Sequence, residues 1–194
     1  MRFKLIAVAA LICVSQTVLA ADNGVYLGAG LASGRFTGCA NITSTCNNFS
    51  ANSTNSGHLR LIGGYDFNKY IGVEVGLSQL GTYKVQNTAL ATVGTSKVSA
   101  FSVAAKGGYT FPHGFSVFGK LGLASVDSKY TADTGMTIPS GADQRSTGLL
   151  FGVGGQYNFN ESFGIRLLTE VIGYKDSAYT GAAGGTNLLA VFKF

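Results

Sequence analysis

The sequence is poor in charged residues and lacks tryptophan entirely. Only 12% of its 194 residues are charged, about half of the fraction found in an average soluble domain. After the first twenty residues, no stretch reaches about 18 apolar residues without glycine or charge, which excludes a conventional transmembrane helix there. With 46% hydrophobic residues and so little charge, the chain is expected to present part of its surface to something other than water.

The N-terminal segment MRFKLIAVAALICVSQTVLA has the three parts of a secretory signal peptide. Arg2 and Lys4 form the cationic start, an apolar run follows from 5 to 14, and the segment ends in Val-Leu-Ala. The apolar run is too short to span a membrane. We therefore predict that residues 1–20 are a signal peptide and that residues 21–194 form one exported domain.

Clusters of basic residues are absent as well. Without Arg2 and Lys4, 12 cations face nine acids, a net charge of +3. No run of lysine or arginine matches the electrostatic footprint of a nucleic-acid-binding protein. The composition therefore predicts no nucleic-acid partner.

Cysteine is scarce, and the mature chain keeps only Cys39 and Cys46. Cys13 lies in the signal peptide and follows Ile12, where a lipoprotein cleavage site needs a small residue. Two neighbouring cysteines in an exported protein predict a local disulfide, because the compartment is oxidising. A metal site needs more ligands nearby, and His58 is the sole candidate, so we expect no metal and no cofactor.

Helical periodicity is nearly absent, and apolar residues alternate with small or polar ones instead. The alternation recurs in eight segments, each about as long as a tilted strand that crosses a bilayer. These segments are Gly24–Phe36, His58–Phe67, Tyr70–Tyr83, Val98–Phe111, Gly114–Val126, Thr147–Phe159, Phe163–Lys175 and Asn187–Phe194.

The links between the segments alternate between short and long. Tight turns (NK, PH and NES) separate four long polar loops, namely Thr37–Gly57, Lys84–Lys97, Asp127–Ser146 and Asp176–Thr186. This order predicts an all-β fold, an eight-stranded antiparallel up-and-down transmembrane β-barrel in a bacterial outer membrane. The short turns would lie in the periplasm and the long loops outside the cell. A soluble lipocalin-like barrel is the structural alternative, with its apolar face inward around a ligand and charge outward.

The third segment indicates which face meets lipid. It places Glu74 among glycine and serine on one face and branched aliphatic residues on the other. Charge on the lipid face would cost about 2–4 kcal/mol near the midplane, so the face that carries Glu74 must line the lumen. Glycine on that face leaves room for long side chains in a barrel this narrow. The predicted lumen charge cluster consists of Arg60, Asp66, Glu74, Lys106, Lys120, Arg166 and Glu170.

Aromatic residues gather at the ends of the segments that meet the short turns. Their concentration there predicts a girdle at one membrane interface, although a soluble core could also hold aromatics. The girdle residues are Tyr65, Phe67, Tyr70, Tyr109, Phe111, Tyr157, Phe159 and Phe163.

Four stretches carry a resemblance to a known family: YIGVEVGLSQLG (70–81), AAKGGYTF (104–111), GVGGQYNFNESFGIRLLTE (152–170) and the terminal VFKF. They resemble the transmembrane domain of the outer-membrane protein A family and its small opacity-like and porin-like relatives. The resemblance implies that Glu74, Lys106, Lys120 and Arg166 belong to a salt-bridged lumen cluster. Gln156 stands where the family often has an acid, so Lys106 is expected to find a different partner.

The resemblance also implies that Phe192 and Phe194 form the signal that the barrel assembly machinery recognises. An ordinary last strand that ends in phenylalanine is the alternative, and Leu189 stands where the family often has glycine. Because the chain stops at Phe194, we expect no peptidoglycan-binding domain and no anchoring to the cell wall.

Three functions remain as alternatives. A structural, surface-exposed barrel would contact outer-membrane lipids, lipopolysaccharide and a host or cell-surface ligand through its loops. A narrow porin-like channel for ions or small solutes is disfavoured by a filled lumen. A barrel enzyme needs a nucleophile, a base and an orienting group together, but Asp66 lies at the far end of the segment from Ser56 and His58, and His113 lies in a turn. We expect the first function and no enzymatic activity.

We predict that Cys39 and Cys46 form a disulfide that restrains the first long loop. Six residues separate them, so the closed ring is small and contributes about 2 kcal/mol through chain entropy. Thiol labelling of the unreduced mature protein should detect no free cysteine. Two reactive thiols would contradict the disulfide without affecting the barrel.

Overall fold

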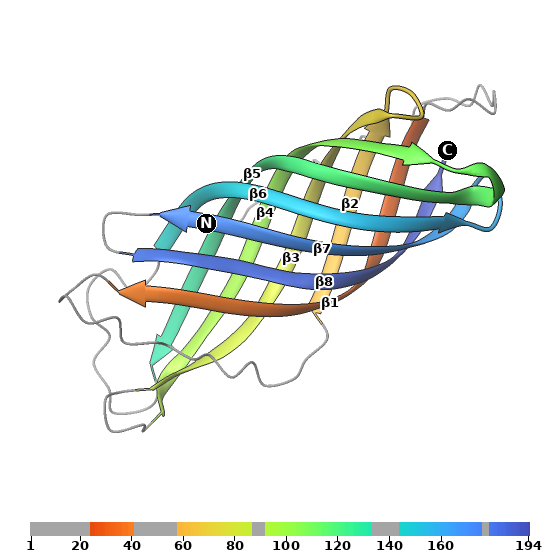
Figure 1. Cartoon of the computed structure of the whole chain (residues 1–194). Coiled ribbons are helices and arrows are strands. Elements are labelled where there is room, and N and C mark those ends of the chain that lie inside the picture. The colour runs from red at the N-terminus through yellow and green to blue at the C-terminus, as the bar shows by residue number, and fades with distance from the viewer. Residues whose placement is uncertain (1–23, 41–57, 87–91, 133–143, 176–178) are drawn as a thin grey trace, which may run out of the picture.

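The computed structural model describes residues 24–40, 58–86, 92–132, 144–175 and 179–194. They form a closed antiparallel barrel in which each strand pairs with its neighbours in sequence and the last strand pairs with the first (Figure 1). The predicted all-β, eight-stranded barrel is confirmed. Its strands are β1 (Gly24–Ala40), β2 (His58–Asp66), β3 (Ile71–Gln86), β4 (Thr92–Thr110), β5 (Phe115–Ala132), β6 (Gln144–Asn158), β7 (Phe163–Lys175) and β8 (Tyr179–Lys193).

The faces of the strands follow the alternation in the sequence. On β3, Ile71 and Leu77 are each 53% exposed, whereas Glu74 is 2% exposed. The outer face of the barrel is therefore aliphatic and the inner face holds glycine and charge, as predicted. A soluble lipocalin-like barrel would have the opposite arrangement, so that alternative is wrong. Among the described residues, no helix is both long and apolar enough to cross a membrane.

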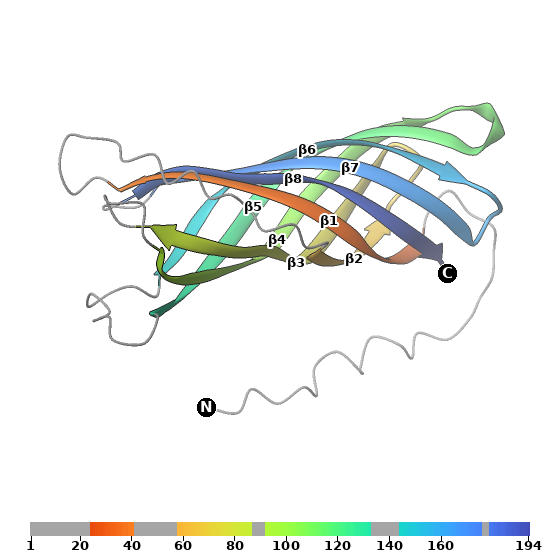
Figure 2. The same ribbon diagram turned by 90° about the horizontal axis from the view of Figure 1, so that it is seen from below.

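Three short turns and the C-terminus share one end of the barrel, here called the short-turn rim (Figures 1 and 2). In two of the turns an asparagine side chain replaces a backbone acceptor. Asn68 Oδ1 accepts hydrogen bonds from the amides of Tyr70 and Ile71, at 2.8 and 3.0 Å, and Asn160 Oδ1 accepts from the two amides that follow Glu161. Asparagine is favoured in turns because its side chain can make such local bonds.

The third turn depends on backbone conformation. A short 3₁₀ helix, η2 (Pro112–Gly114), connects β4 to β5. His113 and Gly114 adopt φ angles of 71° and 81°, in the left-handed region. Proline starts the turn and glycine tolerates positive φ, so the sequence PHG suits this bend.

The predicted boundaries of the long loops are wrong at the opposite end, the long-loop rim. The segment Lys84–Lys97 was expected to be a loop, but β3 continues to Gln86 and β4 begins at Thr92. Pairing of β5 with β6 extends to Ser128 opposite Gln144, and β1 pairs with β8 as far as Ala40 opposite Tyr179. Backbone hydrogen bonds continue where hydrophobic alternation stops, because alternation reports contact with lipid and not pairing.

The aromatic residues lie on the outside of the short-turn rim and contact one another in series. The rings of Tyr109 and Phe111 lie 4.9 Å apart, and Phe111 stacks on Phe115 at 5.9 Å. A second series joins Phe159 and Phe163 at 5.7 Å, and then reaches the last strand. This belt of exposed rings is the geometry of a membrane-interface girdle.

The last residue contributes backbone closure but little side-chain burial. The amide of Phe194 donates to the carbonyl of Val25 at 3.0 Å, while its side chain is 77% exposed. We therefore predict that Phe194→Ala leaves detergent refolding and urea stability near wild type and lowers the outer-membrane yield in cells. Phe67→Ala, at a 51% exposed aromatic of the same rim, is the matched control and should leave the yield unchanged. Equal losses of yield and stability in Phe194→Ala would mean that the residue is only structural.

Candidate functional site

Charged side chains from four strands, β2, β3, β5 and β7, meet inside the barrel. They are almost completely buried: Arg166 is 1% exposed, Arg60 and Glu74 are 2%, Lys120 is 3% and Glu170 is 4%. Isolated charges buried to this extent would be very costly, so the arrangement of partners determines whether the site is stable.

Glu74 on β3 is one centre of this network. Its Oε1 accepts a 2.6 Å bond from Lys120 Nζ on β5, and its Oε2 pairs with Arg166 Nη1 on β7 at 2.5 Å. The hydroxyl of Tyr26 on β1 donates to the same Oε2 at 2.8 Å. One carboxylate thus links three other strands across the lumen.

Glu170 on β7 is the second centre. Its Oε2 lies 2.6 Å from Arg60 Nη2 on β2, and its Oε1 lies 2.6 Å from Lys120 Nζ. The charges therefore alternate along a chain, in the order Arg60, Glu170, Lys120, Glu74, Arg166, which we call the ion-pair chain. Three cations share two acids, so the chain carries one excess positive charge.

Lys106 lies outside this chain, although it is directly opposite Lys120 in the β4–β5 register. Like charges in such a position repel each other. The two lysines extend to different acids, and Lys106 Nζ pairs with Asp66 at 2.5 Å. Gln156 accepts a 2.8 Å bond from Arg166 Nε. Lys106 thus has another partner, and its ammonium also lies 4.5 Å from the centre of the Tyr26 ring.

Glycine makes room for the long side chains. A Cβ added to Gly76 would lie 3.0 Å from Arg60 Nη2, and one added to Gly152 would lie 3.0 Å from Glu170 Cγ. Both distances are shorter than ordinary carbon contacts. Any larger residue at these positions would displace members of the ion-pair chain.

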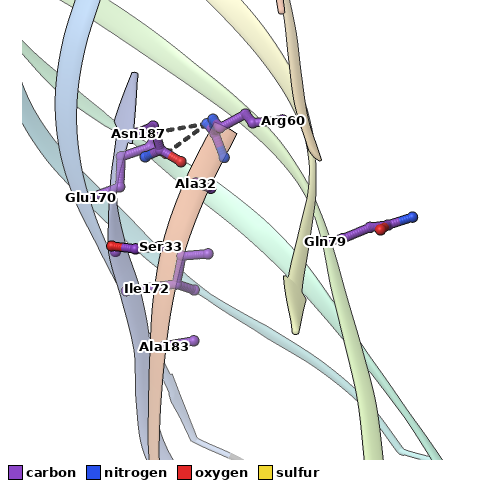
Figure 3. Close-up of a pocket in the computed structure, with 10 residues that line it drawn as sticks. Ala32, Ser33, Arg60, Gln79, Glu170, Ile172, Ala183 and Asn187 are labelled. Atoms are coloured by element: carbon purple, nitrogen blue, oxygen red, sulfur yellow. Dashed lines mark hydrogen bonds and ion pairs between the residues drawn. The ribbon is translucent and has the colours of Figure 1, made fainter. Parts of the chain in front are cut away.

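An apolar cluster occupies the lumen on the long-loop side of the ion-pair chain. Its members are at most 5% exposed and come from β4, β5, β6, β7 and β8. Where the cluster meets the chain, a cavity of about 10 Å³ lies beside Arg60, Glu170 and Asn187 (Figure 3), which is room for one water molecule. The apolar cluster consists of Val98, Ala100, Ala104, Ala124, Val126, Leu150, Ile172 and Ala183.

The structure therefore brings all seven predicted lumen charges into ion pairs: five residues form the ion-pair chain, and Lys106 and Asp66 form a separate pair. Sequence reasoning missed Tyr26 and Asn187, whose Nδ2 donates to the Leu168 carbonyl at 3.2 Å. The alternation along β1 could have identified Tyr26, because Tyr26 lies on the same face of the strand as Gly28 and Ala32, which are both buried.

The predicted disulfide and the combination of His58 with Asp66 were also considered as sites. Cys46 and the side chain of Cys39 lie outside the described residues. His58 and Asp66 occupy opposite ends of β2, roughly 27 Å apart for eight residues of strand, and Asp66 pairs with Lys106. In the described ranges, no group of three or more histidine, cysteine or acidic residues is placed to hold a metal ion.

Closed all-antiparallel barrels with an aliphatic outer face and a charged lumen are typical of outer-membrane proteins. A model of the outer membrane protein beta-barrel domain family matches residues 6–192, and the chain belongs to this family. None of the curated proteins that were compared matches the sequence.

Several solved structures have a similar fold at low sequence identity. Outer membrane protein OprG from Pseudomonas aeruginosa is 13% identical, with a TM-score of 0.64 over 90% of this chain and 96% of that chain. Neisserial surface protein A is 16% identical, with a TM-score of 0.60 over 88% and 97%. Ail of Yersinia pestis, solved with the heparin analogue sucrose octasulfate, is 19% identical, with a TM-score of 0.52 over 89% and 97%.

We predict that Glu74→Ala destabilises the barrel by about 3–5 kcal/mol, because it leaves Lys120 and Arg166 buried without the carboxylate between them. Glu74→Ala combined with Arg166→Ala should recover part of the loss, since Lys120 keeps Glu170. Urea unfolding in micelles measures the free energy of unfolding of the wild type, of the single variant and of the double variant.

Asp127→Ala is the matched control for this experiment. It removes the acid from an exposed pair, in which Asp127 and Arg145 are 44% and 71% exposed and 3.6 Å apart. A change of less than about 1 kcal/mol is expected there. A neutral or stabilising effect of Glu74→Ala would contradict the role of Glu74 as the link between the two cations.

Proposed function

We propose that the protein is a structural, surface-exposed outer-membrane barrel whose lumen does not conduct. The observation that supports this proposal is the filling of the lumen by two successive layers. The ion-pair chain joins β2, β3, β5 and β7 across the barrel, and the apolar cluster lies next to it. An ion that crosses would have to break buried charge pairs and then enter an apolar layer, which is unfavourable in both steps.

The same geometry favours a mechanical role for the ion-pair chain. Strands that are far apart around the barrel are joined through Glu74 and Glu170, so the network resists flattening of a narrow cylinder in a membrane under lateral pressure. Because the contacts are all inside, the outer aliphatic surface remains available to lipid and the long-loop rim to molecules outside the cell. We propose that the protein acts through these surfaces and not through catalysis.

Export and assembly complete the proposal. Residues 1–20 would direct secretion, and the C-terminal strand with Phe192 and Phe194 would be recognised by the barrel assembly machinery. Support comes from membership of the outer-membrane family and from the position of β8, which closes the barrel against β1. Loop contact with a host or cell-surface ligand is part of the proposed role, as for a surface protein.

Planar-bilayer recording tests the closed lumen. The refolded wild-type protein should give no steady current above that of the bare bilayer, at voltages where a general porin opens fully. The comparison variant carries Arg60→Ala, Lys120→Ala, Glu170→Ala and Leu150→Ala, which removes material from both layers. It leaves Glu74 paired with Arg166 and Asp66 paired with Lys106, so the remaining lumen charge is balanced.

This variant should show a measurable current, which establishes that the recording can detect a lumen of this width. Steady wild-type currents equal to those of the variant would overturn the proposal in favour of a narrow channel. The ratio of cation to anion permeability is then measured in the variant. A ratio near one is expected, because the excess positive charge of the lumen has been removed.

A further inference from the structure

A patch of cations lies on the outside of the long-loop rim, on three neighbouring strands. Lys97 on β4, Lys129 on β5 and Arg145 on β6 all belong to the outward-facing rows of their strands and are exposed. Asp127 is the one described acid among them, and it is paired with Arg145. We call these four residues the rim patch, and it carries a net charge of +2.

The rim patch contains an arrangement that is unfavourable by itself. Lys97 and Lys129 are direct partners in the β4–β5 register, so their side chains leave the same face of the sheet next to each other. Like charges in this position destabilise a strand pair. Within the described ranges neither lysine forms an ion pair, whereas Arg145 also donates from Nε to Ser125 Oγ at 2.9 Å. An anion between the two lysines would turn the repulsion into attraction.

The height of the patch relative to the lipid-facing surface identifies its surroundings. The last exposed apolar residues on these strands are Phe101, Leu123 and Leu149, at 46%, 57% and 67% exposure. Lys97 and Arg145 lie four residues beyond this row, about 10 Å along the membrane normal for a strand tilted by roughly 40°. Polar headgroups begin within that distance of the hydrocarbon, and lysine side chains extend towards them.

We propose that Lys97 and Lys129, with Arg145 beside them, bind the phosphate groups of a phosphorylated glycolipid, the lipid A part of lipopolysaccharide, in the outer leaflet. A phosphate carries the charge and the acceptors that two adjacent ammonium groups need, and the guanidinium can add a charge-assisted hydrogen bond. The acyl chains of the same lipid would lie against the aliphatic row below. The assignment depends on outer-membrane location and not on whether the lumen conducts.

Lipid A titration in zwitterionic micelles measures the affinity of each variant. Lys97→Ala combined with Lys129→Ala should weaken binding roughly 30-fold, since each cation near an anionic lipid surface contributes about fivefold. Lys129→Arg should retain binding. Lys69→Ala removes an exposed cation of the short-turn rim, at the opposite end of the barrel from the patch, and should change affinity less than about twofold.

The urea midpoint gives an independent test, because the effect of one substitution on it should reverse between vesicles without lipid A and vesicles that contain it. In phosphatidylcholine vesicles Lys129→Gln should raise the urea midpoint, because it removes the repulsion from Lys97. In vesicles that also contain lipid A the same substitution should lower the midpoint. The single substitution is exposed and conserves size, so folding of the variant is expected.

Three results would overturn the proposal. The first is that dephosphorylated lipid A binds the wild type as tightly as lipid A. The second is that Lys129→Gln shifts the urea midpoint in the same direction in both lipids. The third is that inorganic phosphate raises the urea midpoint of the wild type as much as lipid A does. The first two would remove the phosphate contact, and the third would identify a general anion site in place of a lipid site.

Discussion

The backbone of a strand in lipid must find all its hydrogen-bond partners in protein, because hydrocarbon offers none. In this chain the requirement is met by pairing the first strand with the last, from Tyr26 opposite Lys193 to Ala40 opposite Tyr179. Closure leaves no free edge within the membrane, and it also creates an interior that every inward-facing side chain must share. The composition of the lumen is therefore a consequence of closure.

An interior of this width forces charged side chains into contact. Seven long charged residues face inward, and each acid of the ion-pair chain serves two cations, at Glu74 and at Glu170. The cross-strand lysines, Lys106 and Lys120, are tolerated because their ammonium groups reach different acids. Glycine at positions such as Gly152 is part of the same solution, since the backbone there must leave space for a glutamate side chain.

The two rims of the barrel differ because they meet different surroundings. At the short-turn rim the strands are joined by compact turns, and exposed aromatic rings contact one another around the outside. At the long-loop rim the strands continue beyond the apolar surface with polar side chains, as in the pairing of Lys97 with Lys129. The sheet therefore extends into the region of headgroups and solvent, where side chains with charge can face outward without cost from hydrocarbon.

The sequence alone determined the number of strands, their order, their facing and the identity of the lumen charges. Those features depend on local alternation and on the position of turns, and one residue of shift would move Glu74 from lumen to lipid. Strand ends at the long-loop rim could not be predicted, since hydrophobic alternation stops at the lipid boundary while backbone pairing, as at Gln86 opposite Thr92, does not. Only the tertiary structure decided which cation meets which acid, why Tyr26 belongs to the network, and that Lys97 stands beside Lys129. Such contacts depend on the stagger between strands around a closed barrel, and stagger is a property of the whole sheet that no single segment contains.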